Sequence, residues 1–142
     1  MTLLASAPLR LLLVEDNGAD LRLFQENLKA LPLQTSLDIL RDGEEVLAFL
    51  QQRAPYTDAQ RPDFIFLDMY LPKKTGFQVL RELEQDENLA TIPVVACIGS
   101  SLTKEQLEPY RLPADCFFMK GYDPEELLRI LTHCRAQTAL AS

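Results

Sequence analysis

Three acidic residues of this chain follow two strongly apolar segments, at places where they could do chemistry together. Glu15 and Asp16 come directly after Leu9–Val14, and Asp68 comes directly after Phe64–Leu67. Both segments predict strands buried on both faces, and parallel sheets bind ligands at the carboxyl ends of such strands. Three carboxylates at one edge repel one another unless a cation lies among them. Oxygen donors without histidine or thiolate favour Mg²⁺.

A fourth ionisable group, Lys120, follows the last apolar segment of the chain. At the same edge, its ammonium could pair with Asp68 or with an oxyanion attached to Asp68. Together the four residues fit an aspartyl nucleophile, a metal that neutralises phosphoryl charge and a lysine that holds the product. Taken singly, Asp68 could instead cap a helix and Lys120 could be solvated. Their convergence on one predicted edge favours the reaction centre.

The elements that must position these residues alternate between apolar strands and amphipathic helices. This alternation predicts an α/β fold with a parallel sheet, and the flavodoxin-like (βα)5 doubly wound arrangement with strand order 2-1-3-4-5 is the natural choice. In that order the first and third strands are neighbours. The strands are expected at 9–14, 37–40, 64–67, 94–98 and 116–119, and the helices at 18–30, 46–52, 76–85, 102–108 and 124–136.

Several residues predict where the helices begin and end. Asp123 before Pro124 is a strong helix start, since it supplies an N-cap followed by proline at the first helical position. Pro109 should shorten the fourth helix. We expect residues 137–142 to fray and His133, near the end of the last helix, to be structural or solvated.

The bulk composition excludes several classes of protein. A chain of 142 residues suits one domain, here 1–142 with a core of about 9–138. The net charge of −7 argues against nucleic-acid binding. No apolar segment reaches membrane-spanning length, and the first residues do not read as a signal peptide. The three cysteines form no CxxC pair, so we expect reduced thiols, no zinc site and a cytoplasmic protein.

Four motifs together resemble the response-regulator receiver domains of two-component signalling. They are Leu12-Leu13-Val14-Glu15-Asp16-Asn17, Phe66-Leu67-Asp68-Met69-Tyr70-Leu71-Pro72 with Gly76, Ile92-Pro93-Val94-Val95, and Lys120. The resemblance covers about Leu9 to Thr138, so we expect a single receiver domain without an output domain. The loop at 53–62 and the Leu-Pro-Lys-Lys-x-Gly segment look similar to single-domain regulators that serve bacterial phytochromes.

The resemblance implies a role for each residue of the acidic cluster. Asp68 would accept a phosphoryl group from a histidine kinase, which the narrower similarity suggests is a bacteriophytochrome. Glu15, Asp16, Asp68 and the backbone carbonyl of Tyr70 would bind Mg²⁺. A downstream phosphotransfer or effector protein would then receive the signal, and the resemblance also allows a homodimer.

The chain departs from the family pattern at positions that would transmit the signal. Counted from Pro93, the family's switch Ser/Thr falls at Ile98, which has no hydroxyl. Ser100 or Ser101 could substitute, or these serines could only cap the next helix. Phe117 occupies the aromatic switch position and could rotate or be an ordinary core residue. Gly121 replaces the proline that usually follows the lysine, which places the family's usual cis peptide there in doubt.

These features leave three functions to compare. The leading one is a phosphorylation-controlled receiver that acts by changing protein partners, and not an enzyme that turns over an external substrate. Ile98 and Pro109 motivate the alternative of a degenerate receiver that works as an adaptor without phosphorylation. A phosphohydrolase of the haloacid-dehalogenase type is disfavoured, because those enzymes usually carry Asp-x-Asp on the first strand, whereas Asp68 is on the third and Tyr70 replaces the general acid.

Overall fold

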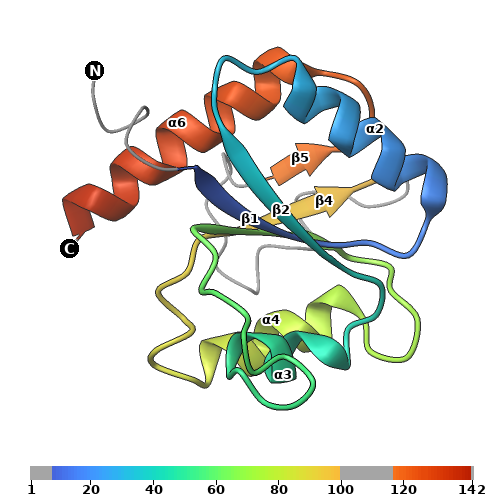
Figure 1. Cartoon of the computed structure of the whole chain (residues 1–142), viewed down its shortest axis with the longest axis vertical. Helices are drawn as coiled ribbons and strands as arrows, with labels where there is room; N and C mark the ends of the chain where they lie inside the picture. Colours follow the sequence, from blue (N-terminus) through green and yellow to red (C-terminus); the bar gives the residue numbers. More distant parts are fainter. Residues whose placement is uncertain (1–7, 100–116, 142) are drawn as a thin grey trace.

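Five parallel strands form one twisted sheet with the order β2-β1-β3-β4-β5, which confirms the predicted order (Figure 1). In this computed structural model, residues 8–99 and 117–141 are described, with side chains described as far as His133. The β1 and β3 strands are neighbours, so their carboxyl ends meet at the middle of one sheet edge. The strands are β1 Leu9–Val14, β2 Thr35–Leu40, β3 Phe64–Asp68, β4 Val94–Ile98 and β5 Phe117–Met119.

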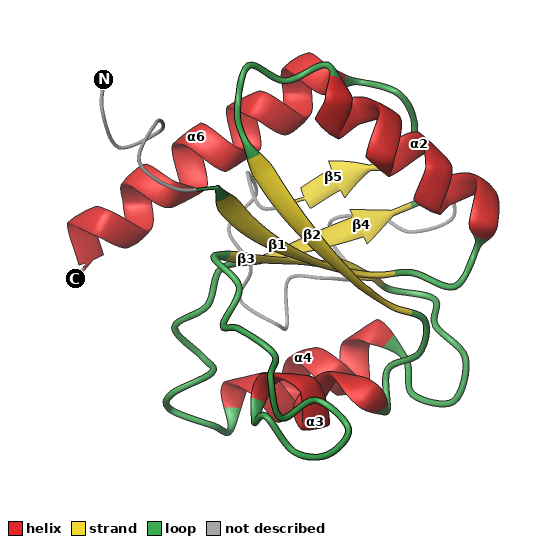
Figure 2. Ribbon diagram, in the orientation of Figure 1, coloured by secondary structure: helices red, strands yellow, loops and turns green. Residues whose placement is uncertain are grey.

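Helices cover both faces of this sheet, as a doubly wound fold requires. Figure 2 shows α2 and α6 over one face and α3 and α4 over the other. Their bounds are α2 Gly18–Lys29, α3 Glu45–Leu50, α4 Gly76–Glu84 and α6 Pro124–Ala141. Five features of the sequence analysis lie outside the described residues: the predicted helix at 102–108, Ser100, Ser101, Pro109 and Cys116. Of the helices that are described, none has the length and apolar character to span a membrane.

The central strand β3 is buried along its whole length, as its unbroken apolar run predicts. Ile65 and Leu67 face the cluster under α3 and α4, whereas Phe64 and Phe66 face the cluster under α2 and α6. Each such side chain stabilises the fold by roughly 1.5–3 kcal/mol through burial. Asp68 therefore lies at the end of the strand that is most completely buried among the five described.

The helix starts agree with their capping residues. Asp123 accepts a hydrogen bond from the amide of Glu126 at 3.1 Å, so it caps α6 as predicted. Asn17 caps α2 by accepting from the amide of Asp20 at 2.9 Å. Thr75 and Gln78 form a reciprocal capping box at the start of α4.

The end of α6 differs from the prediction. The helix continues to Ala141, instead of ending near Ala136 with a frayed tail. The added residues 137–141 include two alanines, a leucine and a glutamine, which are good helix formers, and they contain neither glycine nor proline, so nothing local stops the helix. His133 consequently lies inside α6, with an exposed side chain, and not near the end of the helix.

The turn after Asp68 requires glycine at position 76. The amide of Gly76 donates to the carbonyl of Met69 at 3.3 Å, which folds the turn back onto the end of β3. A Cβ atom at Gly76 would lie 2.6 Å from the carbonyl oxygen of Asp68 and 2.7 Å from Cα of Met69. Backbone atoms cannot give way as a flexible side chain does, so this close approach fixes the loop that follows Asp68.

We expect Gly76→Ala to destabilise the protein by about 1–3 kcal/mol, because the added methyl group overpacks the backbone of Asp68 and Met69. Urea unfolding would measure the change in the free energy of unfolding. Gly18→Ala is the matched control, since a Cβ at Gly18 meets nothing within 4 Å. Equal stability of the two variants would contradict the requirement at position 76.

Candidate functional site

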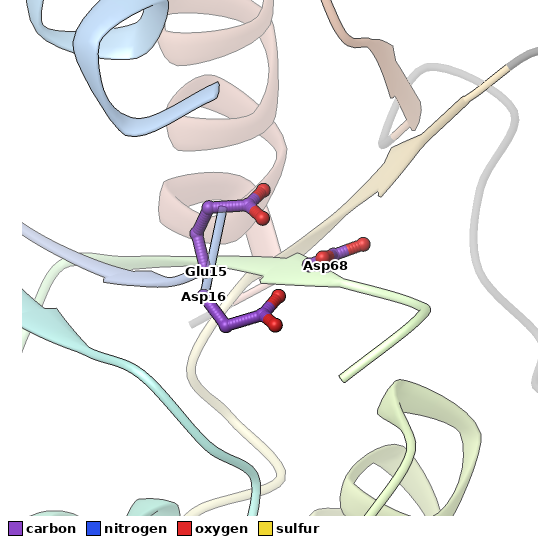
Figure 3. Close-up of side chains that lie close together, drawn as sticks. All are labelled: Glu15, Asp16 and Asp68. Carbon is purple, nitrogen blue, oxygen red and sulfur yellow. The ribbon is translucent and has the colours of Figure 1, made fainter. Parts of the chain in front are cut away.

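The three carboxylates predicted to cluster do lie together at the carboxyl edge of the sheet. Glu15 and Asp16 follow β1, Asp68 ends β3, and an oxygen from each lies within 4.8 Å of the others (Figure 3). The Glu15 and Asp68 residues are each 3% exposed, whereas Asp16 is exposed. The cluster therefore has two buried members and one that faces solvent.

Lys120 places its ammonium directly against this cluster. Its Nζ atom lies 2.9 Å from Oε1 of Glu15 and 3.1 Å from Oδ1 of Asp68. A third carboxylate, Asp20, is 3.1 Å from the same Nζ atom. An ammonium has three N–H donors, so each carboxylate can receive one of them.

The position of Lys120 follows from backbone pairing at the end of β5. Its amide donates to the carbonyl of Ile98 at 3.0 Å, which extends the pairing of β4 with β5 by one residue. The next residue, Gly121, has a φ of 146°, a conformation that favours glycine. The Lys120–Gly121 peptide bond is trans, so the family's usual cis bond is absent here.

Burial dominates the electrostatics of Glu15. It raises the pKa of this carboxyl to about 7, although the hydrogen bonds from Lys120 and from the Asn17 amide act in the opposite direction. Nearby Asp68 raises it further. For Lys120, burial lowers the pKa, but the hydrogen bonds to Glu15 and Asp20 and the charge of Asp68 outweigh burial and raise it overall. Lys120 is therefore a firmly charged ammonium.

The donor set fits a hard divalent cation. All three clustered side chains offer carboxylate oxygens, and Mg²⁺ binds such oxygens while keeping several waters. Lys120 alone does not neutralise Glu15, Asp16 and Asp68. Oδ1 of Asp68 accepts from both Lys120 and the Tyr70 amide, each at 3.1 Å. The Tyr70 carbonyl stays a predicted ligand.

The predicted switch positions lie beside the site, in the apolar core. Ile98 ends β4 and is 4% exposed, and Phe117 begins β5 and is 8% exposed. Both belong to the cluster on the α3 and α4 face of the sheet. Ile98 therefore places a buried apolar side chain where the family pattern has a hydroxyl, and Phe117 packs as a core aromatic. Ser100 lies outside the described residues.

Sequence reasoning did not identify Asp20 or Asn27 as parts of the site. Asn27 is fully buried on α2, donates to the Gly121 carbonyl at 2.9 Å and accepts from the Asp123 amide at 2.8 Å. It therefore fixes the loop that follows Lys120. The signal was a polar residue at helical spacing on an apolar face, three positions after Phe24. Asp20, in the first turn of α2, gave no comparable signal.

Comparison with known proteins assigns the class of this fold and site. The family model for the response regulator receiver domain matches residues 11–132. The chain belongs to the response-regulator receiver family.

The similar proteins include regulators named for phytochromes. The chain is 40% identical over 127 residues to response regulator Rcp1 of Synechocystis sp. (strain ATCC 27184 / PCC 6803 / Kazusa), covering 89% of this chain and 86% of Rcp1. The Mn²⁺-bound Rcp1 crystal structure aligns with a TM-score of 0.72, covering 91% of this chain and 93% of that one. The phosphorylated cyanobacterial phytochrome response regulator RcpA is 36% identical, with a TM-score of 0.73 and coverage of 96% and 97%.

We expect Asn27→Ala to destabilise the protein by about 2–3 kcal/mol, because it leaves the Gly121 carbonyl and the Asp123 amide without their buried partner. Chemical denaturation would measure the loss. Gln25→Ala, at an exposed position of the same helix, is the control and should stay close to the parent. A similar, small effect of both substitutions would show that Asn27 does not hold the loop.

The raised pKa of Glu15 predicts a pH-dependent stability in the absence of divalent ions. The folded state binds the Glu15 proton more tightly than the unfolded state, whose pKa is near 4.5. The stabilisation of the folded state by this proton is fully present below pH 4.5, and it is lost as the pH rises through about 7.

The Glu15→Gln variant should therefore lose less stability than the parent across that range, by on the order of 1–3 kcal/mol. Unfolding titrations in a chelator at several pH values would measure it. Glu26→Gln, which removes an exposed carboxylate of α2, should keep the parent's pH dependence. Parallel curves for the parent and Glu15→Gln would exclude the raised pKa.

Proposed function

We propose that this chain is a single-domain response regulator that accepts a phosphoryl group on Asp68. The observation that supports this most is the buried Asp68 carboxylate, in contact with the Lys120 ammonium and beside two further acids. Membership of the receiver family supports the same reaction. Domain 1–142, with its core at about 9–138, would then comprise the receiver alone.

The chemistry follows from the contacts of Asp68. Lys120 and the Tyr70 amide both contact Oδ1, so Oδ2 is the oxygen placed to attack phosphorus. An O–P bond would form as the P–N bond of a phosphohistidine breaks, and the histidine nitrogen would keep the electron pair. Lys120 would then hold a phosphoryl oxygen through its positive charge.

Mg²⁺ is the cofactor of this site, and the clustered carboxylates supply its ligands. Glu15, Asp16 and Asp68 would hold the ion, with the Tyr70 carbonyl as a further ligand. When bound, the ion would neutralise negative charge on the transferring group. The Mn²⁺-bound form of Rcp1 supports a divalent ion as the cofactor.

The partners follow from the relatives. The donor would be a histidine kinase, and the phytochrome regulators among the similar structures favour a bacterial phytochrome. A downstream phosphotransfer or effector protein would read the modified state, in the cytoplasm, and a homodimer is one form the protein could take. The chain would signal in this way without turning over an external substrate.

A degenerate receiver is the second candidate, because Ile98 places a buried branched aliphatic side chain where a switch hydroxyl is expected. Such a protein would bind its partner equally well in all states of Asp68. The labelling experiment below, repeated with partner binding as the readout, distinguishes the two functions.

We expect acetyl phosphate and Mg²⁺ to add one phosphoryl group to the full chain, in an adduct that is stable in acid and labile in base. Asp68→Asn should abolish the adduct, because an amide oxygen is a far weaker nucleophile than a carboxylate. Intact-mass spectrometry would detect it. Chelation of Mg²⁺ should reduce labelling strongly.

Asp38→Asn is the matched control, since Asp38 is an exposed acid of β2, away from the cluster. It should be labelled like the parent. An unchanged adduct in Asp68→Asn would overturn the assignment of the acceptor.

A further inference from the structure

Asp20 contributes a fourth carboxylate to the site that the receiver motifs do not include. It lies in the first turn of α2, where the Asn17 side chain accepts from its amide at 2.9 Å and fixes its backbone. Its Oδ2 atom accepts from Nζ of Lys120 at 3.1 Å, across 100 residues of sequence. The Asp20 side chain is 30% exposed, so this ion pair is partly shielded from solvent.

The contacts of Lys120 lie on one side of the acidic cluster. In the described part of the chain its ion pairs join Glu15, Asp20 and Asp68, and Asp16 is not among them. Two of the three, Glu15 and Asp20, lie where β1 leads into α2. The ammonium therefore lies on the α2 side of the cluster, and Asp16 remains available to bind another cation.

This arrangement matters because two cations must share one group of acids. A divalent ion and the ammonium both require Asp68, and at such short separations their mutual repulsion is substantial. A carboxylate that contacts Lys120 but lies outside the Glu15, Asp16 and Asp68 cluster compensates the charge of the ammonium. Asp16 then stays available as a ligand for the divalent ion. Asp20 has this property. The neighbouring cavity of about 20 Å³, lined in part by Glu15, Asp20 and Lys120, is only about large enough for one water.

We propose that Asp20 is a positioning residue that holds Lys120 on the α2 side of the site, so that Mg²⁺ and the ammonium can be bound together. The proposal rests on the proposed function only in taking the cluster as the Mg²⁺ site. Asp20 acts through Lys120 and is not itself a ligand of the metal.

A double-mutant cycle on the full-length chain tests this role, with Mg²⁺ binding measured by calorimetry. In the parent background, Asp20→Asn should weaken Mg²⁺ binding by about fivefold or more, because the ammonium loses an anchor and its charge is less compensated. With Lys120→Met or Lys120→Gln already present, the same Asp20→Asn change should alter binding by less than about twofold. Glu26→Gln is the control for lost charge on α2 and should have little effect in either background.

The outcomes separate positioning from simpler roles. An equal loss of affinity in both backgrounds would mean that Asp20 acts directly on the metal, and no loss in the parent background would mean that it does not act; either overturns the proposal. Because binding is measured without phosphorylation, absence of an adduct on Asp68 would reject the proposed function while leaving this coupling intact. Circular dichroism of each variant confirms that the comparison is between folded proteins.

Discussion

The interaction on which this structure depends is the repulsion among carboxylates that share one edge of the sheet. Glu15 and Asp68 are almost fully buried, and one ammonium, from Lys120, contacts both. Burial of such charges is unfavourable unless they are paired and hydrogen-bonded. The raised pKa of Glu15 shows that Lys120 compensates only part of the effect of burial. A further cation would complete the compensation, and the clustered carboxylates suit a divalent ion in that role.

The rest of the fold serves to hold these charges at that edge. The pairing of β1 with β3 brings the two acidic strand ends together, and apolar side chains on both faces of β3 fix the strand that carries Asp68. Gly76 lets the following turn pack against the backbone of Asp68. The pairing of β4 with β5 extends to Lys120, so a third strand end places the ammonium beside the carboxylates.

The sequence predicted the parts of the structure that follow from local patterns. The unbroken apolar run before Asp68 indicated a central strand, and Asp123 before Pro124 indicated a capped helix. It did not predict the ion pair of Asp20, because contacts between residues 100 positions apart depend on how α2 lies against β5. The predicted end of α6 was wrong, because residues with high helix propensity continue past the last residue of the apolar pattern.

The buried amide of Asn27 has a consequence for how this domain can be recombined. Its side chain bonds to its own helix at the Leu23 carbonyl and to both sides of Tyr122, at Gly121 and Asp123. Helix α2 and the junction that follows Lys120 are thus held together by one side chain, although they are far apart in sequence. A chimera that exchanges this helix with that of another receiver must exchange the junction as well, or leave a mismatched amide inside the core.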